Sequence, residues 1–352
     1  MPRQKYSWED EAQPRRRRAW RWLLLLPLLL LLLGAGVGAA IVLSARSEFL
    51  ILAGQFDLSR LERMESASLI YDRKGGLMGK IFIQNRDPVS YEKLSPWLVQ
   101  AVVAAEDQRF WEHTGVDYWG IVRAAQANWT AGRIRQGAST VTQQLARNSF
   151  DLKGRTYRRK LLEMALAVQI EKKFPKEKIM EMYLNRVYFG GGLYGAEAAA
   201  RGYFGVSAAE LTPWQAATLA GLLKSPNSLS PWTNPAGARE NRDVVLRQMR
   251  DLGFLTGAEY QKAVADQLVI RERPSPAKES YALDHIRQQA IASLGFERAM
   301  NGGFRIYTTI DAEMQRVAER ALQRRLAEVE KRPGYANETF EDFRRRYDAR
   351  PP

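Results

Sequence analysis

The chain has 352 residues, 45% of them hydrophobic, which is enough for two domains with a sizeable core. It contains no cysteine, so disulfides, thiolate catalysis and cysteine-ligated metal sites are excluded. The formal net charge of +14 favours an anionic partner. No zinc-finger, RNP-type or helix-turn-helix signature accompanies that charge, so lipid head groups or a phosphorylated lipid are expected and nucleic acid is not.

An apolar run over residues 20–43 is the first feature in chain order, and it carries no charge after Arg21. At 1.5 Å per residue it is long enough to cross about 30 Å of hydrocarbon. The arginines at 15–18 precede it, and the positive-inside rule therefore predicts a cytoplasmic N-terminus with the rest of the chain outside. A cleaved signal peptide is the alternative, with residues 34–40 as a small-residue cleavage site, but its apolar core would be shorter.

Strand-like and then helical patterns follow. Residues 47–58 are apolar and are predicted either to lie against the outer leaflet or to form a packed linker. The stretches 67–72 and 79–83 flank the turn sequence Arg-Lys-Gly-Gly and predict a β-hairpin. The expected helices are one from Ser95 to the carboxylates at 106–107, then 116–131, 158–174, 176–184, 195–203, 208–223 and 241–252. The predicted fold class is therefore mainly α, with a small N-terminal hairpin.

Two consecutive carboxylates, Glu106 and Asp107, end an apolar helix, which is an unusual place for charge. Steps of three or four residues from Val99 reach Glu106, so Glu106 lies on the apolar face. A carboxylate partly removed from water has a raised pKa, as proton transfer near pH 7 requires. The alternative is that the two carboxylates cap the helix end or form salt bridges with Arg109 and Arg123.

A polar segment over residues 135–148 (RQGASTVTQQLARN) carries closely spaced hydroxyl, amide and guanidinium groups. Such a segment, with Gly137 to free the backbone, makes a poor core and a good binding loop. We interpret it as an array that holds sugar hydroxyls and phosphate oxygens. The alternative is a solvated turn followed by an N-capped helix.

A cationic cluster over residues 155–160 (RTYRRK) opens the next predicted helix, whose N-terminal dipole also favours anions. Phosphate is the expected ligand. Glu163 shares a helix face with apolar residues as far as Ile170, so it is predicted to point into the fold; an i to i+4 pair with Arg159 is the alternative. Glu171 is a rival for an acidic role, but Glu163 is closer to the cationic cluster.

Four sequence blocks occur in order: EDQRFWEHTG from Glu106, GASTVTQQLARN from Gly137, RKLLE from Arg159 and KIMEMYLN from Lys178. Together they resemble glycosyltransferase family 51, the peptidoglycan polymerase domains of class A penicillin-binding proteins and their monofunctional relatives. The resemblance extends from about residue 69 to about residue 255. It implies a lysozyme-like helical fold that polymerises lipid II, the lipid-linked disaccharide-peptide precursor, at the outer face of the bacterial cytoplasmic membrane.

The resemblance also implies roles for residues. Glu106 resembles the general base that deprotonates the 4-hydroxyl of the acceptor sugar, whose oxygen attacks the anomeric carbon at the diphospholipid end of the growing strand, with inversion. Glu163 resembles the second acidic residue, which assists the departing diphosphate directly or by holding Mg²⁺ or Mn²⁺; no organic cofactor is implied. Family members often have Lys in place of Arg147. In this chain the planar, forked guanidinium of arginine therefore replaces the compact ammonium of lysine. The implied substrate contacts are Asp107, Ser139, Thr140, Gln143, Gln144, Arg147, Arg155, Arg159 and Lys160.

The C-terminal part of the chain has a different character. Residues 302–311 predict a strand followed by a capped helix, similar to the start of a penicillin-binding transpeptidase region. Ser275 and Lys278 match a Ser-x-x-Lys nucleophile pattern, but prolines on both sides of Ser275 deny it a helix, so no transpeptidase activity is expected. The chain is then either a truncated bifunctional enzyme or a natural short form. The predicted parts are a cytoplasmic tail (1–19), a transmembrane helix (20–43), a glycosyltransferase domain (44–255) and a linker with an incomplete transpeptidase-type region (256–352).

Two other classes of function compete with the polymerase. A peptidoglycan hydrolase also uses two carboxylates on a lysozyme-like fold, but it needs neither the cationic cluster 155–160 nor a membrane anchor. A non-catalytic scaffold would bind wall precursors or proteins of cell-wall synthesis and division, and loss of Glu106 or Glu163 would have favoured it. The polymerase is therefore predicted, with lipid II, the growing glycan strand and membrane lipids as partners.

Overall fold

The computed structural model is mainly helical, which confirms the predicted class. It describes residues 29, 31–33, 36, 44, 47–62, 67–81, 87–131, 137–150, 152, 156–273 and 280–348. Its elements are η1 (Leu58–Leu61), β1 (Ser68–Tyr71), β2 (Leu77–Ile81), η2 (Tyr91–Lys93), α2 (Pro96–Glu106), α3 (Tyr118–Ala131), α4 (Val141–Ser149), α5 (Tyr157–Lys173), α6 (Lys176–Leu184), α7 (Ala196–Phe204), η3 (Ala208–Glu210), α8 (Pro213–Leu222), α9 (Pro235–Asp251), α10 (Gly257–Ala265), α11 (Tyr281–Leu294), α12 (Phe296–Asn301), β3 (Arg305–Tyr307), α13 (Ala312–Glu330) and α14 (Phe340–Asp348).

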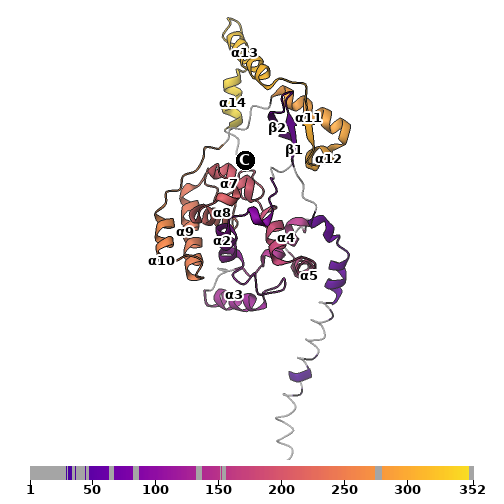
Figure 1. Ribbon diagram of the computed structural model, residues 1–352, viewed down its shortest axis with the longest axis vertical. Helices are drawn as coiled ribbons and strands as arrows, with labels where there is room; N and C mark the ends of the chain where they lie inside the picture. Colours follow the sequence, from indigo (N-terminus) through magenta and orange to yellow (C-terminus); the bar gives the residue numbers. More distant parts are fainter. Residues whose placement is uncertain are drawn as a thin grey trace, which may run out of the picture.

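A helical body is built around α8, which is buried from Ala216 to Leu222. A helix that is apolar on all sides belongs inside a core. α2 and α9 pack on α8, and α4 packs against α5 and α6. Figure 1 shows α2 and α8 between α9 and α10 on one side and α4 and α5 on the other, with α3 at the lower edge. The helices that follow the polar segment and the cationic cluster, α4 and α5, thus lie against each other on one side of α2 and α8.

The predicted helix boundaries agree with α3, α5, α6 and α7 to within two residues. The helix predicted over 208–223 is wrong, because the structure divides it into η3 and α8. Pro213 lacks an N–H donor and starts α8 at its first turn, with Thr212 in a capping box. Ser95 is the N-cap of α2 as predicted, but its hydroxyl donates to the carbonyl of Leu211 at 2.9 Å instead of capping. Ser95 therefore ties α2 to the turn before α8.

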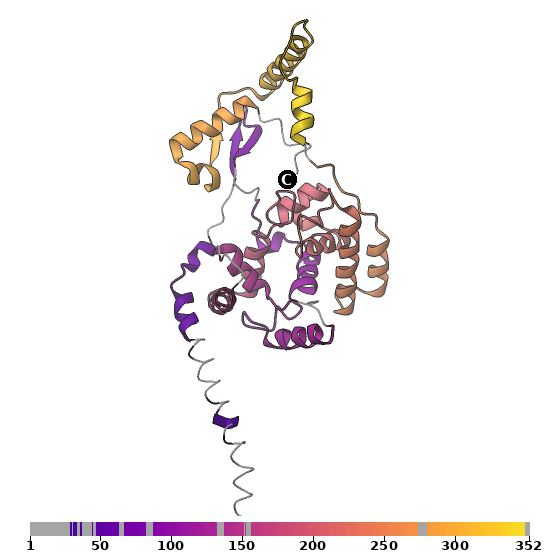
Figure 2. The ribbon, with the colours of Figure 1, turned by 180° about the vertical axis from the view of Figure 1, so that it is seen from behind.

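A three-stranded sheet with its own small core lies beside the helical body. β1 and β2 form the predicted antiparallel hairpin, and β3 pairs in parallel with β1, in the order β2-β1-β3. Ile70 and Ile81 pack against Ile286 and Ala290 of α11 and Ala299 of α12. Figure 2 shows the strands against α11 and α12 from behind. The C-terminal part of the chain thus adds the third strand to the sheet that the N-terminal hairpin begins. The predicted strand and capped helix in 302–311 are confirmed.

The predicted transmembrane helix lies largely outside the described residues, which include only 29, 31–33 and 36 of that stretch. Within the described ranges, no helix combines the length and the apolar character that crossing a membrane requires. Residues 47–62 pack on the helical body, since Ala53 and Leu61 are buried in its core. Arg186 of the helical body donates to the carbonyl of Leu61 at 2.8 Å. This packing supports the linker alternative for 47–58.

The core of the helical body continues past the predicted domain end at residue 255. Ala263 of α10 lies in that core, and Leu268 and Ile270 pack against it. The N–H of Arg271 donates to the carbonyl of Tyr203 at 2.8 Å. The described helical body therefore extends to about this point, and the functional domain boundaries stay a prediction.

Candidate active site

Glu106 is the last residue of α2, and its carboxylate meets α4. The side-chain amide Nε2 of Gln144 donates to Glu106 Oε2 at 2.6 Å. Burial raises the pKa of the Glu106 carboxyl, while the Gln144 hydrogen bond and the charge of Arg147 act in the opposite direction. The net result is a raised pKa, as predicted from the apolar helix face. Such a carboxyl is suited to accept a proton near neutral pH.

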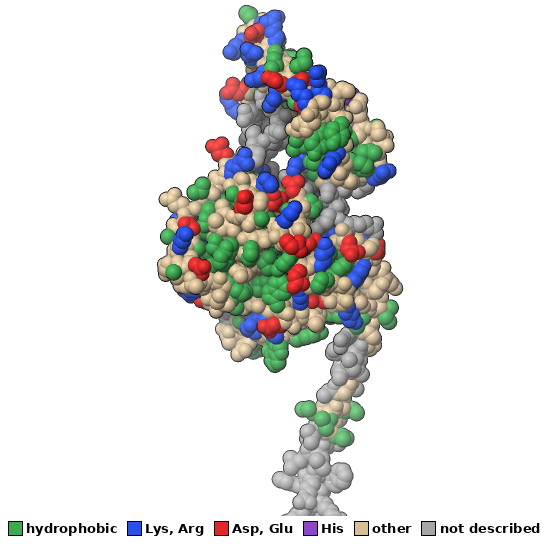
Figure 3. All heavy atoms as spheres, in the orientation of Figure 1, with side chains coloured by type: hydrophobic (Ala, Val, Ile, Leu, Met, Phe, Trp, Pro, Cys, Tyr) green, Lys and Arg blue, Asp and Glu red, His purple; other side chains and the backbone are tan. Residues whose placement is uncertain are grey.

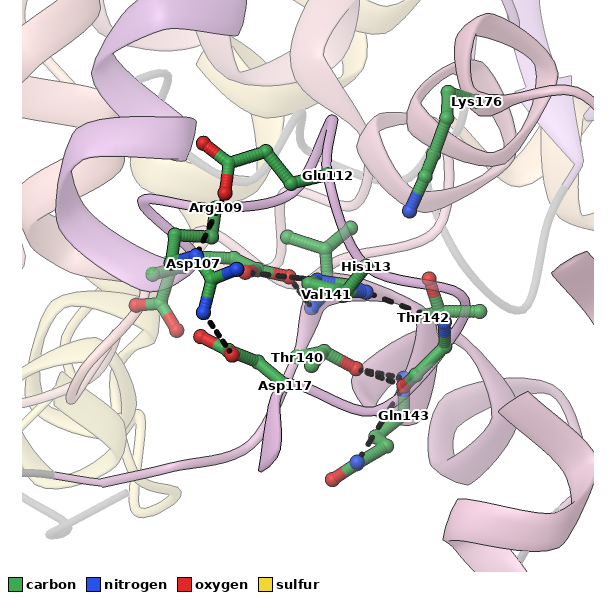
Figure 4. A network of polar contacts seen from close by, with 12 residues as sticks. Asp107, Arg109, Glu112, His113, Asp117, Thr140, Val141, Thr142, Gln143 and Lys176 are labelled. Atoms are coloured by element: carbon green, nitrogen blue, oxygen red, sulfur yellow. Dashed lines mark hydrogen bonds and ion pairs between the residues drawn. The ribbon is translucent and has the colours of Figure 1, made fainter. Parts of the chain in front are cut away.

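Asp107 has a different environment, since it is buried and both of its carboxylate oxygens are engaged (Figure 4). Its Oδ2 accepts from the backbone N–H of Val141 at 3.0 Å and from His113 Nε2 at 2.9 Å. His113 Nδ1 accepts from the N–H of Gly115, which places the ring proton on Nε2. Asp107 therefore holds the first turn of α4. This geometry fits a positioning role better than the predicted contact with substrate.

The alternative salt bridge from these carboxylates to Arg109 is not formed. Arg109 instead pairs with Glu112 at 2.7 Å and with Asp117 at 3.0 Å. Figure 4 shows both pairs within the loop that follows α2. Arg109 is thus paired with carboxylates of its own loop, and the site carboxylates keep other partners.

The described part of the polar segment, residues 137–148, is a short extended stretch that leads into α4. The Thr140 hydroxyl accepts from the N–H of Gln143 at 3.2 Å and donates to the carbonyl of Gly115 at 2.7 Å. Thr140 and Gln143 are both buried. The N-capped helix of the alternative interpretation is therefore present, but it is buried rather than solvated, and only 137–140 has the character of a loop.

Gly115 brings the loop after α2 against the backbone of α5. Its φ is +96°, and an added Cβ would lie 2.7 Å from the carbonyl carbon and oxygen of Ala167. We expect Gly115→Ala to destabilise the fold by about 1–3 kcal/mol, because the left-handed backbone and the clash both oppose a side chain. Thermal unfolding measures this, with Gly137→Ala as control, since a Cβ at Gly137 meets no atom within 4 Å. Equal melting temperatures for the two variants would contradict the close packing.

Lys160 joins the polar segment to α5. Its ammonium donates to Ser139 Oγ and to Gln143 Oε1, each at 2.7 Å, and lies 3.4 Å from Glu163 Oε2. Burial lowers the pKa of Lys160, and the Glu163 carboxylate opposes that effect. The predicted phosphate-binding cation is therefore oriented by neighbouring hydroxyl and amide groups.

Glu163 points into the fold as predicted and is only 1% exposed. The alternative pair with Arg159 is also present, with Arg159 Nε 3.3 Å from Glu163 Oε1. The geometry of that contact is too poor for a hydrogen bond, so both atoms are buried without a hydrogen-bond partner. An unsatisfied buried polar group costs about 1–3 kcal/mol, which favours a site completed by a ligand.

Glu171, the rival acidic residue, belongs to a structural network. It accepts from Thr142 Oγ1 and from Lys176 Nζ, each at 2.7 Å. The Lys176 ammonium also lies over the ring of Phe110, 4.5 Å from its centroid. Glu171 therefore joins α4, α5 and α6 through its Oε1, which supports the preference for Glu163.

The fourth block of the resemblance, from Lys178, binds the backbone of the segment that precedes α2. Glu181 Oε2 accepts from the N–H of Tyr91 at 3.0 Å. Asn185 binds both backbone groups of Val89, at 3.0 Å and 2.7 Å. These side chains attach the chain before α2 to α6.

Two further residues of the site, His113 and Tyr183, lie in blocks of the resemblance but have no contacts predicted from the sequence. The Tyr183 hydroxyl donates to Gln144 Oε1 at 3.2 Å. Tyr183 lies between Met182 and Leu184 in an apolar stretch, so the sequence pattern is that of a core residue. His113 forms no ligand pattern, since the chain has only one other histidine. The partners of both residues follow only from the packing between helices.

The structure brings most of the predicted site residues together, and one lies outside the described residues, namely Arg155. The predicted Mg²⁺ or Mn²⁺ does not fit the residues seen at Glu163, because Arg159 and Lys160 already place two positive charges beside it. Among the described residues, no three side chains of the metal-binding types gather closely enough to hold a metal ion. The contacts form two groups, one of Glu106 with Gln144 and the other of Ser139, Gln143, Lys160, Glu163 and Arg159. The two groups meet at α4, where Gln143 and Gln144 are consecutive residues.

Comparison with known proteins places this site in a family. The family model described as transglycosylase matches residues 74–250, half of the chain. The chain belongs to the transglycosylase family. The resemblance to glycosyltransferase family 51 is thereby confirmed, and the site at the ends of α2, α4 and α5 lies within the matched range.

Relatives of this transglycosylase family member are penicillin-binding proteins. Penicillin-binding protein 1A of Aquifex aeolicus is 44% identical over 265 residues, covering 75% of this chain and 36% of that protein. The Escherichia coli protein of the same name is 38% identical over 275 residues, covering 78% and 32%. A crystal structure of penicillin-binding protein 1A from Haemophilus influenzae matches with 24% identity and a TM-score of 0.48, covering 78% and 31%. The chain thus spans about a third of the length of the curated relatives it matches.

Proposed function

We propose that this chain is a peptidoglycan glycosyltransferase that polymerises lipid II into glycan strands, with inversion at the anomeric carbon and release of the diphospholipid carrier. One observation carries the proposal: the same site holds Glu106, whose pKa is raised by burial, and Glu163, buried between Arg159 and Lys160. A transferase with a diphospholipid donor needs both a base and an anion-binding end. A lysozyme-like fold is part of this proposal.

Glu106 is the proposed base. Its carboxylate takes the proton from the 4-hydroxyl of the acceptor sugar, and the oxygen of that hydroxyl bonds to the anomeric carbon of the donor. The bond from the anomeric carbon to the diphosphate oxygen breaks at the same time, and its electron pair leaves with the diphosphate. Direct attack from the side opposite the leaving group produces inversion. Gln144 holds one oxygen of Glu106, and the other oxygen is left for the acceptor.

The departing diphosphate is proposed to meet the positive end of the site. Arg159 and Lys160 lie in the first turn of α5, one turn before Glu163, and the helix dipole at this end also favours an anion. The charge of Arg147 lowers the pKa of both Glu106 and Lys160, so its guanidinium lies near both groups. Arg147 lies in the last turn of α4, and its planar fork is proposed to bind phosphate oxygens.

A peptidoglycan hydrolase remains the competing function, because two carboxylates also cleave glycosidic bonds. The cations around Glu163 favour the transferase, since hydrolysis produces no diphosphate. Chromatography of the lipid products tests the choice. The proposal predicts consumption of lipid II with stoichiometric release of the diphospholipid. Soluble fragments from preformed peptidoglycan, with lipid II left unchanged, would overturn it.

The proposal includes contact with a membrane, through the predicted single-pass anchor and through α3. Four apolar side chains of α3 are strongly exposed, with fractions from 59% for Val122 to 88% for Trp129. Figure 3 shows hydrophobic side chains at the lower edge of the helical body, where α3 lies in Figure 1. Tryptophan and tyrosine favour the interface between lipid and water, so we propose that this face meets the bilayer that carries the lipid-linked donor.

The α3 surface gives a fluorescence prediction for the chain reconstituted into vesicles with brominated acyl chains. Replacing Trp119 and Trp129 by Phe removes two of the nine tryptophans and keeps the surface apolar. We expect the fraction of tryptophan emission quenched by bromine to fall, because these two rings are proposed to contact lipid, while Trp20 and Trp22 of the predicted anchor are kept in every variant. Trp232→Phe, a half-buried position outside α3, serves as the control. A fall of equal size in the control would contradict the contact.

A further inference from the structure

Tyr183 lies on α6 and is fully buried behind the proposed base. Its hydroxyl is 3.2 Å from Gln144 Oε1, and Gln144 Nε2 is 2.6 Å from Glu106 Oε2. The three side chains form a hydrogen-bonded chain that runs from α6 through α4 to the end of α2. Nothing in the mechanism above uses Tyr183.

The orientation of an amide depends on its partners. The oxygen and the NH2 group of a glutamine have nearly the same shape, so packing alone does not select which of them faces a neighbour. Only the NH2 group of Gln144 can donate to the carboxylate of Glu106. A hydroxyl that donates from the opposite side selects this orientation, because it needs the amide oxygen as acceptor.

We propose that Tyr183 is a positioning residue for the base: it holds the Gln144 amide so that the NH2 group faces Glu106. The inference rests on the proposed function, in which Glu106 takes the proton of the acceptor hydroxyl. Tyr183 does not touch substrate in this arrangement. It acts through Gln144 on the charge state and the direction of the Glu106 carboxylate.

The Tyr183 hydroxyl keeps its proton over the working pH range. Burial raises its pKa well above the ordinary value of 10.0, and the charge of Glu106 acts in the same direction. The charged groups that face Glu106 are Asp107 of its own segment, which raises the pKa of Glu106, and Arg147 of α4, which lowers it. His113 neighbours Asp107 through their hydrogen bond. The hydroxyl therefore stays a donor while Glu106 titrates.

Tyr183→Phe removes the hydroxyl and leaves the buried ring. Gln144 is then free to turn, and Glu106 loses a hydrogen bond that stabilises its charged form. We expect the Glu106 pKa to rise by about one pH unit, the size expected for one hydrogen bond to a charged group. Infrared difference spectra between each protein and its Glu106→Gln counterpart measure this titration directly. In turnover of lipid II, we expect kcat to fall about 10-fold and KM to change little. The acidic limb of the pH–rate profile should move to higher pH.

Two controls separate positioning from structural support. Tyr203 is equally buried, but its hydroxyl donates to the backbone carbonyl of Phe189, so Tyr203→Phe should leave the Glu106 titration unchanged. In a Gln144→Ala background, Tyr183→Phe should have no further effect on the titration or on kcat, because the intermediary is gone.

The outcomes are distinct. An unchanged Glu106 titration in folded Tyr183→Phe overturns the inference, as does a shift of the same size in the Gln144→Ala background. Absence of lipid II turnover in the parent protein overturns the proposed function instead. The infrared titration does not depend on activity, so it still decides whether Tyr183 orients Gln144.

Discussion

Glu106→Gln is expected to lower the rate of glycan strand formation by roughly 10²–10⁴-fold, the usual contribution of a general base. The amide is nearly isosteric with the carboxylate but cannot accept the proton of the acceptor hydroxyl. Gln144 Nε2 can still donate to the amide oxygen, so the local packing is kept. Initial rates of lipid II consumption measure the loss, and binding of a diphospholipid analogue should be largely retained. Near-normal rates would remove Glu106 from the mechanism.

The same variant gives a stability signature with a definite sign. Burial raises the pKa of Glu106 above 4.5, so the folded protein binds this proton more tightly than the unfolded chain does. The charged carboxylate therefore costs stability above the folded-state pKa, and this cost vanishes below the unfolded value. The melting temperature of Glu106→Gln should equal or exceed that of the parent at neutral pH, and the difference should shrink on acidification. The acidic limb of parent activity should likewise lie above pH 4.5.

Glu163→Gln is the second substitution expected to have a large effect, with a loss of about 10²-fold in kcat. The carboxylate sits 3.3 Å from Arg159 and 3.4 Å from Lys160, so its charge holds both cations toward the leaving group. Preorganised charges of this kind contribute about 10²–10³-fold in other sites. Stability should fall less than in Glu171→Gln, because Glu163 Oε1 accepts no hydrogen bond and Oε2 accepts only a long one from Lys160, at 3.4 Å.

Glu171→Gln is the matched control for Glu163→Gln. Glu171 accepts from Thr142 and Lys176, so its replacement should lower the melting temperature and leave kcat of the folded protein less affected. Parallel measurement of kcat and thermal unfolding for the two variants separates the roles. A larger loss of stability in Glu163→Gln than in Glu171→Gln, together with a larger loss of kcat in Glu171→Gln, would assign the second acidic role to Glu171 instead.

The sequence was sufficient to place Glu106 and Glu163, because the helical period and their apolar neighbours are local information. It also predicted the hairpin from its turn residues. The pairing of β3 with β1 could not be predicted, since parallel pairing between distant segments leaves no local sequence pattern. The division at Pro213 was predictable from the proline and its capping threonine.

The contacts within the site depend on packing between helices. Gln144 reaches Glu106 because α4 is held against the end of α2 by Asp107, and nothing in the spacing of the sequence predicts that distance. Asp107 itself resembles a substrate-binding residue in sequence, and only its hydrogen bonds to His113 and Val141 show that both oxygens are engaged. Tyr183 is indistinguishable from a core residue until its hydroxyl has a partner.

Incubation of the purified, detergent-solubilised chain with labelled lipid II, with the products separated by size, tests the central claim most directly. The account predicts long glycan strands that lysozyme degrades, formed by the parent and not by Glu106→Gln. Absence of polymer from lipid II, together with shortening of preformed peptidoglycan by the parent, would contradict it and favour a hydrolase.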